Sequence, residues 1–148
     1  MITKVPRLYT ILFLIAVLLL FIPPIIDAGN GFWKTKGDCS VVMLIDGDTV
    51  KLQCEEGGSK NARILGYDTP EKNAQCITEY VNANRATWPL RWALWTSDII
   101  EVSSNKRDKY GRDLIVLMAD GKDVADHMIS SGLARAYYGG KRQGWCGP

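Results

Sequence analysis

The chain has 148 residues, of which 47% are hydrophobic and 23% are charged. Such a chain can bury one core, which excludes a disordered protein and a chain of several full-size domains. Its 18 Lys and Arg stand against 16 Asp and Glu, for a formal net charge of +2, and this excludes wholesale electrostatic wrapping of nucleic acid. Any function on nucleic acid must therefore come from a local site.

The N-terminal segment has the layout of a secretory signal peptide. Lys4 and Arg7 precede an apolar run over residues 8–26, which is the order of basic and apolar regions in such peptides. We predict that residues 1–28 are removed as a leader and that residues 29–148 form the mature domain.

The alternative is an uncleaved membrane anchor, because the 19 residues of the apolar run can span a bilayer, whose apolar core needs about 17–25. Pro23 and Pro24 are expected to shorten the continuous helix, which favours cleavage. In both cases the domain lies outside the cytoplasm. It is secreted or periplasmic if the leader is removed, and anchored by a single span if the leader is retained.

The cysteines agree with export. All four lie beyond the apolar run, and an even number of cysteines in an exported chain indicates disulfides. The chain has no Cys-x-x-Cys pair and only one histidine, so a zinc site is not expected. Three pairings are possible among Cys39, Cys54, Cys76 and Cys146.

A hairpin predicted in the first third of the domain selects one of these pairings. Two strand-like runs, residues 40–46 and 48–54, are joined at Gly47. If the chain turns at this point, Cys39 and Cys54 lie directly opposite each other on neighbouring strands, at a separation that a disulfide can bridge. The remaining two cysteines then form the second bond and tie the C-terminal tail to the start of the central helix.

The rest of the chain predicts three more strands and two helices. In the longer helix Pro89 is expected to interrupt the pattern, with Thr87 capping a second helical segment. Five short strands with a helix between the third and fourth, and a helix near the C-terminus, favour an α+β fold that is mainly β: a five-stranded OB-type barrel. The elements are strands at residues 61–67, 99–102 and 114–118, a helix at 77–95, and a short helix from residue 124 to Gly132.

Polar residues gather at three strand ends, in residues 46–49, 63–71 and 107–112. Each segment alone is typical of a turn with solvated charges. Together they supply carboxylates that suit Ca²⁺ or Mg²⁺, a further carboxylate that can orient or deprotonate water, and two arginines that can hold a phosphate bidentately. These are the groups that phosphoryl transfer requires.

Three motifs stand in a fixed order in these segments: Ile45-Asp-Gly-Asp-Thr-Val50, Arg63-x₄-Asp68-Thr-Pro-Glu71 and Asp108-Lys-Tyr-Gly-Arg112. In order and internal spacing they resemble the active-site motifs of the staphylococcal nuclease (thermonuclease) homologues. The likeness runs from about residue 41 to residue 138. The resemblance implies an OB-fold, Ca²⁺-dependent phosphodiesterase that acts on DNA and RNA and leaves 3′-phosphate ends.

The resemblance also implies a role for each matching residue. Asp48 and Asp68 match the carboxylate ligands of Ca²⁺, and Thr69 matches the ligand that acts through its backbone carbonyl. Glu71 matches the proposed general base. The other matches are Arg63 and Arg112, which would bind the phosphate, and Lys109, Tyr110 and Tyr138, which would contact the nucleotide.

The chain departs from the family pattern in two places. Trp88, Trp92 and Trp95 add aromatic bulk to the central helix, which puts the substrate preference in doubt. The C-terminal tail adds Lys141 and Arg142, which we expect to be solvated on a disulfide-tied terminus and not to touch phosphate.

Two other functions compete with this interpretation. One is a non-catalytic OB-fold module that binds nucleic acid, since such folds bind single strands by stacking and basic grooves. The other is an exported, disulfide-linked interaction domain. Because the metal carboxylates, the glutamate and both arginines are present together, we favour the enzyme. We expect a monomer that acts on single-stranded or frayed DNA and RNA and has no protein partner. We expect it to be attached to a membrane only if the N-terminal segment is uncleaved.

Overall fold

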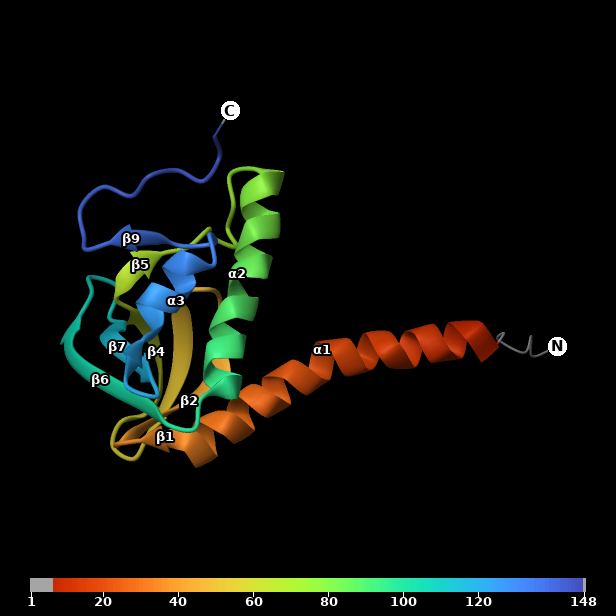
Figure 1. The fold of residues 1–148 in the computed structure, drawn as a ribbon, viewed down its shortest axis with the longest axis horizontal. Helices are drawn as coiled ribbons and strands as arrows, with labels where there is room; N and C mark the ends of the chain where they lie inside the picture. Colours follow the sequence, from red (N-terminus) through yellow and green to blue (C-terminus); the bar gives the residue numbers. More distant parts are fainter. Residues whose placement is uncertain (1–6, 148) are drawn as a thin grey trace.

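A strongly curved sheet packs against helices α2 and α3, while helix α1 extends away from the rest of the molecule (Figure 1). This computed structural model describes residues 7–147, so Lys4 of the predicted leader lies outside the described residues. The α+β, mainly β barrel predicted from the sequence is confirmed.

The sheet runs in the order β1-β6-β7-β4-β3-β2, with β4 and β7 parallel. Its two edges, β1 (Thr35–Lys36) and β2, follow each other in the chain, so the sheet curls round until its edges meet at one corner. The five predicted strands are its main members: β2 (Cys39–Leu44), β3 (Thr49–Cys54), β4 (Gly58–Ile64), β6 (Ile100–Arg107) and β7 (Asp113–Ala119).

The third predicted strand is in fact two strands, which corrects the prediction of one strand over residues 61–67. After β4 the chain turns at Leu65 and Gly66, and β5 (Gly66–Asp68) pairs with β9 (Arg135–Tyr137) in a separate two-stranded sheet. A short strand β8 (Lys122–Asp123) extends the edge of β7. The break after β4 carries Asp68 out of the barrel to its rim, beside the C-terminal segment.

Both predicted disulfides are present, Cys39–Cys54 and Cys76–Cys146. Cys39 pairs with Cys54 in the register of the hairpin, as predicted. An irregularity between Val41 and Met43 then shifts the pairing of β2 with β3 by one residue. The shift comes just before the loop that joins the two strands.

Helix α2 (Ile77–Thr96) runs unbroken through Pro89, which corrects the predicted interruption. Thr87 does not cap a new segment, because its hydroxyl donates to the carbonyl of Asn84 within the helix at 2.6 Å. One face of the helix is buried against the barrel, with Leu90 and Leu94 almost fully covered, and this packing outweighs the hydrogen bond that proline removes. The short helix α3 (Val124–Ser130) begins where it was predicted.

Helix α1 (Arg7–Lys34) is also continuous, so the expected shortening at Pro23 and Pro24 is wrong. It runs eight residues beyond Ile26, the end of the apolar run, and its last turns pack on β2 and α2. By length and composition it can cross a membrane, although a signal sequence passes the same test.

The core lies inside the barrel and beneath α2 and α3. It is built from alternate residues of the strands, which point inward, and from one face of each helix. Its largest fully covered members are Val41, Val50, Leu52, Ile64, Tyr67, Leu90, Ile100, Ile115, Leu117, Val124 and Met128.

Candidate active site

The loop between β2 and β3 holds Asp48 in a fixed position. Asp46 accepts a hydrogen bond from the backbone N–H of Asp48 at 3.2 Å. Gly47 packs so closely on α2 that an added Cβ would lie 2.8 Å from the Cβ of Ala86, so only glycine fits here. The hydroxyl of the buried Tyr67 donates to the carbonyl of Gly47 at 2.8 Å. Tyr67 therefore positions the loop, a role that its core-like pattern in the sequence did not reveal.

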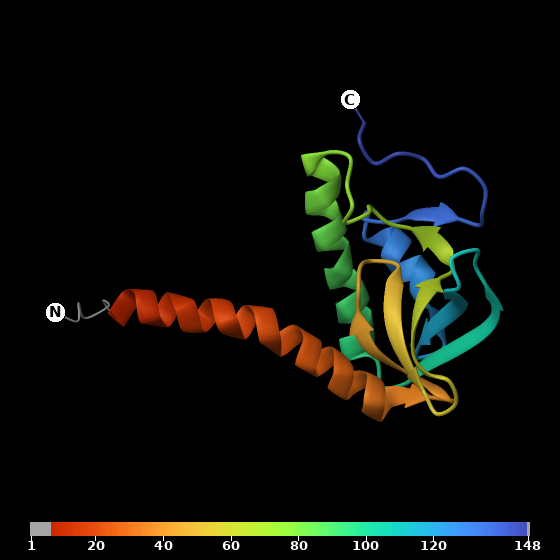
Figure 2. The same ribbon diagram turned by 180° about the vertical axis from the view of Figure 1, so that it is seen from behind.

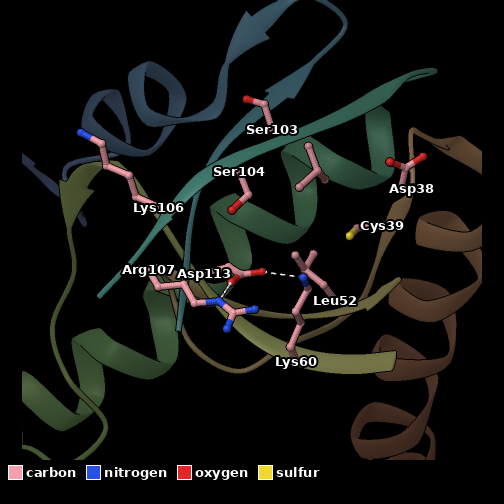
Figure 3. Close-up of a pocket in the computed structure, with 10 residues that line it drawn as sticks. Asp38, Cys39, Leu52, Lys60, Ser103, Ser104, Lys106, Arg107 and Asp113 are labelled. Carbon is pink, nitrogen blue, oxygen red and sulfur yellow. Dashed lines mark hydrogen bonds and ion pairs between the residues drawn. The ribbon is translucent and has the colours of Figure 1, made fainter. Parts of the chain in front are cut away.

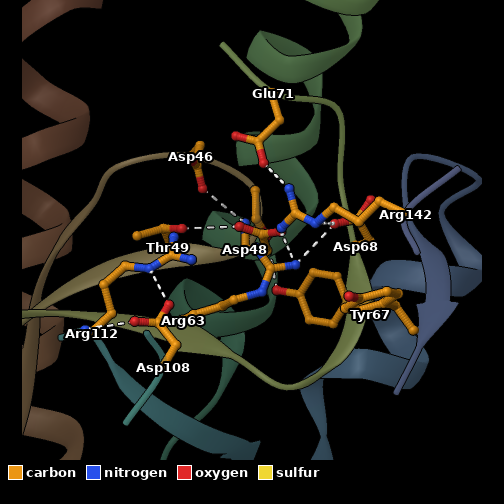
Figure 4. A network of polar contacts seen from close by, with 12 residues as sticks. Asp46, Asp48, Thr49, Arg63, Tyr67, Asp68, Glu71, Asp108, Arg112 and Arg142 are labelled. Carbon is orange, nitrogen blue, oxygen red and sulfur yellow. Dashed lines mark hydrogen bonds and ion pairs between the residues drawn. The ribbon is translucent and has the colours of Figure 1, made fainter. Parts of the chain in front are cut away.

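Three buried charged residues meet below the rim of the barrel (Figure 4). Arg63, near the end of β4, places Nη2 2.9 Å from Oδ2 of Asp48 and 2.9 Å from Oδ1 of Asp68. Asp48 is only 2% exposed, and burial raises its pKa to about 7 although Arg63 lowers it. The predicted phosphate-binding arginine and both predicted metal carboxylates thus form one cluster.

Two atoms of this cluster lack a hydrogen-bond partner among the residues that the structure describes: Oδ2 of Asp48 and Nη1 of Arg63. Nη2 of Arg63 and Oδ2 of Asp48 are close enough for an ion pair, at 2.9 Å, but their angles are not those of a hydrogen bond. Oδ2 of Asp48 has this ion pair with Nη2 of Arg63 but no hydrogen-bond donor, and Nη1 of Arg63 has no acceptor among the described residues. Buried polar atoms are nearly always hydrogen-bonded, so the site favours a ligand that offers a positive charge to Oδ2 and an acceptor to Nη1. Thr69 follows Asp68 and is 1% exposed, and its side chain packs beside Gly47 of the loop that carries Asp48.

Arg142 enters the cluster from the C-terminal tail, which corrects the expectation of a solvated side chain. Its Nε lies 2.9 Å from Oδ1 of Asp68, its Nη1 contacts Oε1 of Glu71, and its Nη2 lies 3.9 Å from Oδ2 of Asp48. The guanidinium group therefore occupies the space that three carboxylates share (Figure 4).

The Cys76–Cys146 disulfide explains how the tail reaches this site. It fixes Cys146 near the segment that carries Glu71, and the indole N–H of Trp145 donates to Oδ2 of Asp68 at 3.3 Å. The predicted disulfide could have indicated that Arg142 lies near Glu71, because Arg142 is four residues from one of its cysteines and Glu71 is five residues from the other.

The second predicted arginine lies apart from the acidic cluster, in the loop between β6 and β7. Arg112 Nε binds Oδ2 of Asp108 at 2.7 Å. The other oxygen of Asp108 accepts the backbone N–H groups of Arg112 and Tyr110, each at 2.9 Å. Asp108 thus ties the loop together and orients the Arg112 guanidinium.

An open cleft of about 960 Å³ joins these parts. The side chain of Glu71 is 43% exposed at its edge, and the predicted nucleotide contacts Tyr110 and Tyr138 are 73% and 89% exposed. Asp48 and Asp68 are not in its lining, but both contact Arg63, which is. The predicted site residues in its lining are Arg63, Glu71, Lys109, Tyr110, Arg112 and Tyr138.

A second groove, of about 660 Å³, lies between β3, β4 and β6 (Figure 3). Lys60 Nζ and Arg107 Nε bind the buried carboxylate of Asp113 at 2.7 and 2.9 Å. The hydrogen bond from Lys60 holds the pKa of Asp113 below its usual range, with a smaller contribution from Arg107. Because Asp113 already pairs with two of its cations, this groove is a weaker candidate for a phosphate than the cleft.

Comparison with known families identifies one match, to the family described as "Staphylococcal nuclease homologue", over residues 61–144. The match includes Arg63, Asp68, Glu71 and Arg112, and the hairpin loop with Asp48 lies outside it.

Three curated bacterial proteins resemble the chain. It is 34% identical over 107 residues to "SPbeta prophage-derived endonuclease YokF" of Bacillus subtilis (strain 168), which covers 68% of this chain and 34% of the relative. It is 36% identical over 100 residues to "Endonuclease YncB" of the same strain, covering 64% and 45%. It is 27% identical over 99 residues to "Thermonuclease" of Staphylococcus hyicus, covering 66% and 58%. The chain therefore matches about a third to three fifths of the length of these relatives.

Proposed function

Because the chain belongs to the family of staphylococcal nuclease homologues, we propose that it is a Ca²⁺-dependent nuclease that hydrolyses phosphodiester bonds of DNA and RNA and leaves 3′-phosphate ends. The observation that carries this proposal is the cluster of Asp48, Asp68 and Arg63 beneath a cleft that Glu71 and Arg112 line. These residues come from loops and strands far apart in the sequence, and they supply the charges that phosphoryl transfer needs.

The donor set fits a calcium ion. Asp48, Asp68 and the backbone carbonyl of Thr69 would hold it, and Oδ2 of Asp48, which accepts no hydrogen bond, is a suitable ligand atom. Hard oxygen donors with few protein ligands suit the flexible coordination of Ca²⁺ better than the strict octahedron of Mg²⁺. When bound, the ion supplies positive charge to a phosphate oxygen and to water.

The side chains of the chain divide the remaining work. Glu71 accepts a proton from a water molecule as the water oxygen bonds to phosphorus, and the bond from phosphorus to the 5′ oxygen breaks. The 5′ oxygen takes up a proton from the solvent and leaves as a hydroxyl, Glu71 returns its proton to the solvent, and the phosphate stays on the 3′ oxygen. Arg63 and Arg112 hold the non-bridging oxygens and stabilise their added negative charge. Glu71 contacts Arg142 in this structure, so Arg142 must release it before the proton moves.

The cleft suits unpaired bases. Tyr110 and Tyr138 present exposed rings beside Lys109 along the path that leads to Arg112. Exposed aromatic rings stack on unpaired bases of any sequence, whereas in a duplex the faces of the bases are covered by the neighbouring base pairs. We therefore propose single-stranded or frayed DNA and RNA as substrates. All the proposed roles are filled by one chain, so a monomer is sufficient.

A labelled single-stranded oligonucleotide tests the proposal, with Ca²⁺ or with excess chelator and with the product ends identified by mass. We expect cleavage only with Ca²⁺ and products that carry a 3′-phosphate. Glu71→Gln should lower kcat by about 10²–10⁴-fold, the usual value of general-base catalysis, with little change in KM. Glu56→Gln, in the exposed turn between β3 and β4, is the matched control and should leave the rate unchanged.

The outcomes separate the candidate functions. Cleavage at the full rate in chelator would contradict the metal mechanism, and a Glu71→Gln enzyme with the wild-type rate would contradict the role of the base. If the wild-type chain binds the oligonucleotide with Ca²⁺ and never cleaves it, the non-catalytic OB-fold module is correct.

A further inference from the structure

The outer part of α1 is apolar on all sides, and apart from the buried Pro23 it stands free of the domain. Residues 8–26 contain no charged residue, and their exposed large apolar side chains range from 70% exposed at Leu20 to 37% at Ile26. At 1.5 Å per residue this segment is about 30 Å long, which equals the apolar thickness of a bilayer. A monomeric soluble protein rarely leaves so large an apolar surface in water.

The inner end of α1 is built into the domain. Asp27 is 4% exposed, accepts a hydrogen bond from the indole N–H of Trp95 at 2.9 Å and pairs with Nε of Arg91 at 2.9 Å. One turn later, Gly31 lies so close to β2 that an added Cβ would be 1.5 Å from the carbonyl oxygen of Val41. Cleavage after residue 28 would remove Asp27 and leave the Arg91 and Trp95 donors without this buried acceptor.

Helix α2 carries a second apolar surface, which we name the α2 stripe. Its members lie at helical spacings of three, four or seven residues and so share one face, opposite the face that packs on the barrel, with the polar Asn84 between Val81 and Trp88. Arg85 lies along the same face. The α2 stripe consists of Ile77 (83% exposed), Tyr80 (55%), Val81 (48%), Trp88 (51%) and Trp92 (63%).

The two surfaces lie on one side of the molecule. In Figures 1 and 2, α2 covers the barrel on the side toward which α1 projects, and it runs across the direction of α1. If α1 stands along the normal of a bilayer, α2 therefore lies along the bilayer surface. Tryptophan and tyrosine prefer this interfacial region, where the ring is half apolar and half wet.

We propose that α1 is retained as a transmembrane anchor and that the α2 stripe lies in the interface of the same phospholipid bilayer. The domain is then held against the membrane at two points, and the basic Arg7 marks the cytoplasmic end of the span. This proposal does not depend on the nuclease activity.

The first test concerns retention of the anchor. The full chain is produced in a bacterium with its N-terminal segment, membranes are washed with alkaline carbonate, and the intact mass is measured. We expect the protein in the membrane pellet with the full mass of 16.5 kDa. A soluble chain that lacks residues 1–28 would overturn the proposal.

The second test concerns the α2 stripe. The full chain is reconstituted into vesicles of phosphatidylcholine and phosphatidylglycerol with brominated acyl chains, which quench tryptophan only on contact. We expect Trp88→Phe/Trp92→Phe to lose most of the quenched intensity, because phenylalanine keeps the apolar surface and removes the signal. Trp145→Phe, on the tail beside Asp68, is the matched control and should lose none of it.

Either of two results would overturn this docking. Quenched intensity that is the same in Trp88→Phe/Trp92→Phe and in the wild type would show that the stripe does not touch lipid. A dimer in detergent, in which Trp88 and Trp92 are shielded from both bromine and aqueous acrylamide, would show that a second copy covers the stripe instead.

Discussion

At the scale of single residues, Asp48 combines a functional charge with a cost in stability. Its carboxylate is buried under the loop between β2 and β3, with Arg63 as its nearest cation. Burial disfavours the ionised form and therefore raises the pKa of Asp48 to about 7. A site that binds a cation needs the ionised form, so the fold keeps a charge that would be more stable as a neutral group.

We therefore expect Asp48→Asn to abolish Ca²⁺-stimulated hydrolysis and to stabilise the fold. Because the folded pKa of Asp48 lies above its ordinary value, the wild type loses stability as pH rises from about 4 to about 7. Asparagine does not ionise, so the variant should be more stable above pH 7 by on the order of 1–3 kcal/mol, and the difference should close toward pH 4. Thermal unfolding in chelator at pH 8 and pH 4.5 measures this, with Glu56→Gln as control. A variant that melts below the wild type at pH 8 would contradict the argument.

Arg142 places a positive charge where a cation would be bound. Its guanidinium group contacts Asp68 and Glu71 and lies 3.9 Å from Asp48. Arg142→Ala removes that charge, so we expect Ca²⁺ to bind more tightly, by about 10-fold or more, since unit charges about 4 Å apart interact by about 1 kcal/mol in water and about 4 kcal/mol near a protein surface. Calorimetric titration with Ca²⁺ measures the affinity. Lys141→Ala, which removes the neighbouring charge of the tail, is the matched control, and equal affinities in both variants would exclude competition at Arg142.

At the scale of secondary structure elements, Asp113 joins three strands. It lies at the start of β7, and its carboxylate binds Lys60 of β4 and Arg107 of β6. These bonds lower its pKa, so they stabilise the fold above the ordinary aspartate pKa of about 4 and are lost as pH falls through the folded value. Asp113→Asn should cost about 1–2 kcal/mol at pH 7, because hydrogen bonds to a charged group contribute about 1.5–3 kcal/mol and the exposed Arg107 partner is screened by solvent. Urea unfolding at pH 7 and pH 3 tests this: the deficit should shrink at pH 3, and a deficit equal at both would point to packing instead.

The elements that the sequence predicted are those whose own pattern decides their structure. The strands β2, β3, β4, β6 and β7 alternate between core and surface or lie at clear turns, so periodicity identifies them. The two short strands β5 and β9 have three residues each, too few for any period, and they form because each pairs with the other. The effect of the prolines in α1 and α2 was predicted wrongly for a related reason: the contacts that keep those helices continuous come from other parts of the chain.

Some residues of the candidate site could likewise be predicted from the sequence, and others are visible only in the structure. The residues that the motifs contributed lie together in the structure. Arg63, Glu71 and Arg112 line the cleft, and Asp48 and Asp68 contact Arg63. Arg142 lies on a tail without a motif, and only the folded chain brings it to the carboxylates. Tyr67 has the pattern of a core residue, and its hydroxyl bond to Gly47 is visible only in three dimensions.

At the scale of the whole molecule, the two disulfides differ in reach. Cys39–Cys54 spans 15 positions within one hairpin, whereas Cys76–Cys146 spans 70. In the chain-entropy model the longer loop contributes about 4 kcal/mol and the shorter about 3. Cys76→Ser/Cys146→Ser should therefore lose slightly more stability in urea than Cys39→Ser/Cys54→Ser, and only the former should alter Ca²⁺ affinity, because it frees the tail with Arg142. A change in Ca²⁺ affinity in the hairpin variant alone would contradict this assignment.

The longer disulfide also closes a covalent ring that holds α2, β6, β7, α3 and β9. The loop between β6 and β7, with Lys109 and Arg112, is an exposed target for trypsin-like proteases inside this ring. A single cut there opens the ring and does not divide the protein, because both new ends stay attached through Cys76 and Cys146. A domain on the outer side of a membrane, as proposed above, meets such proteases, and a nicked chain would keep both halves of its cleft until a reductant separates them.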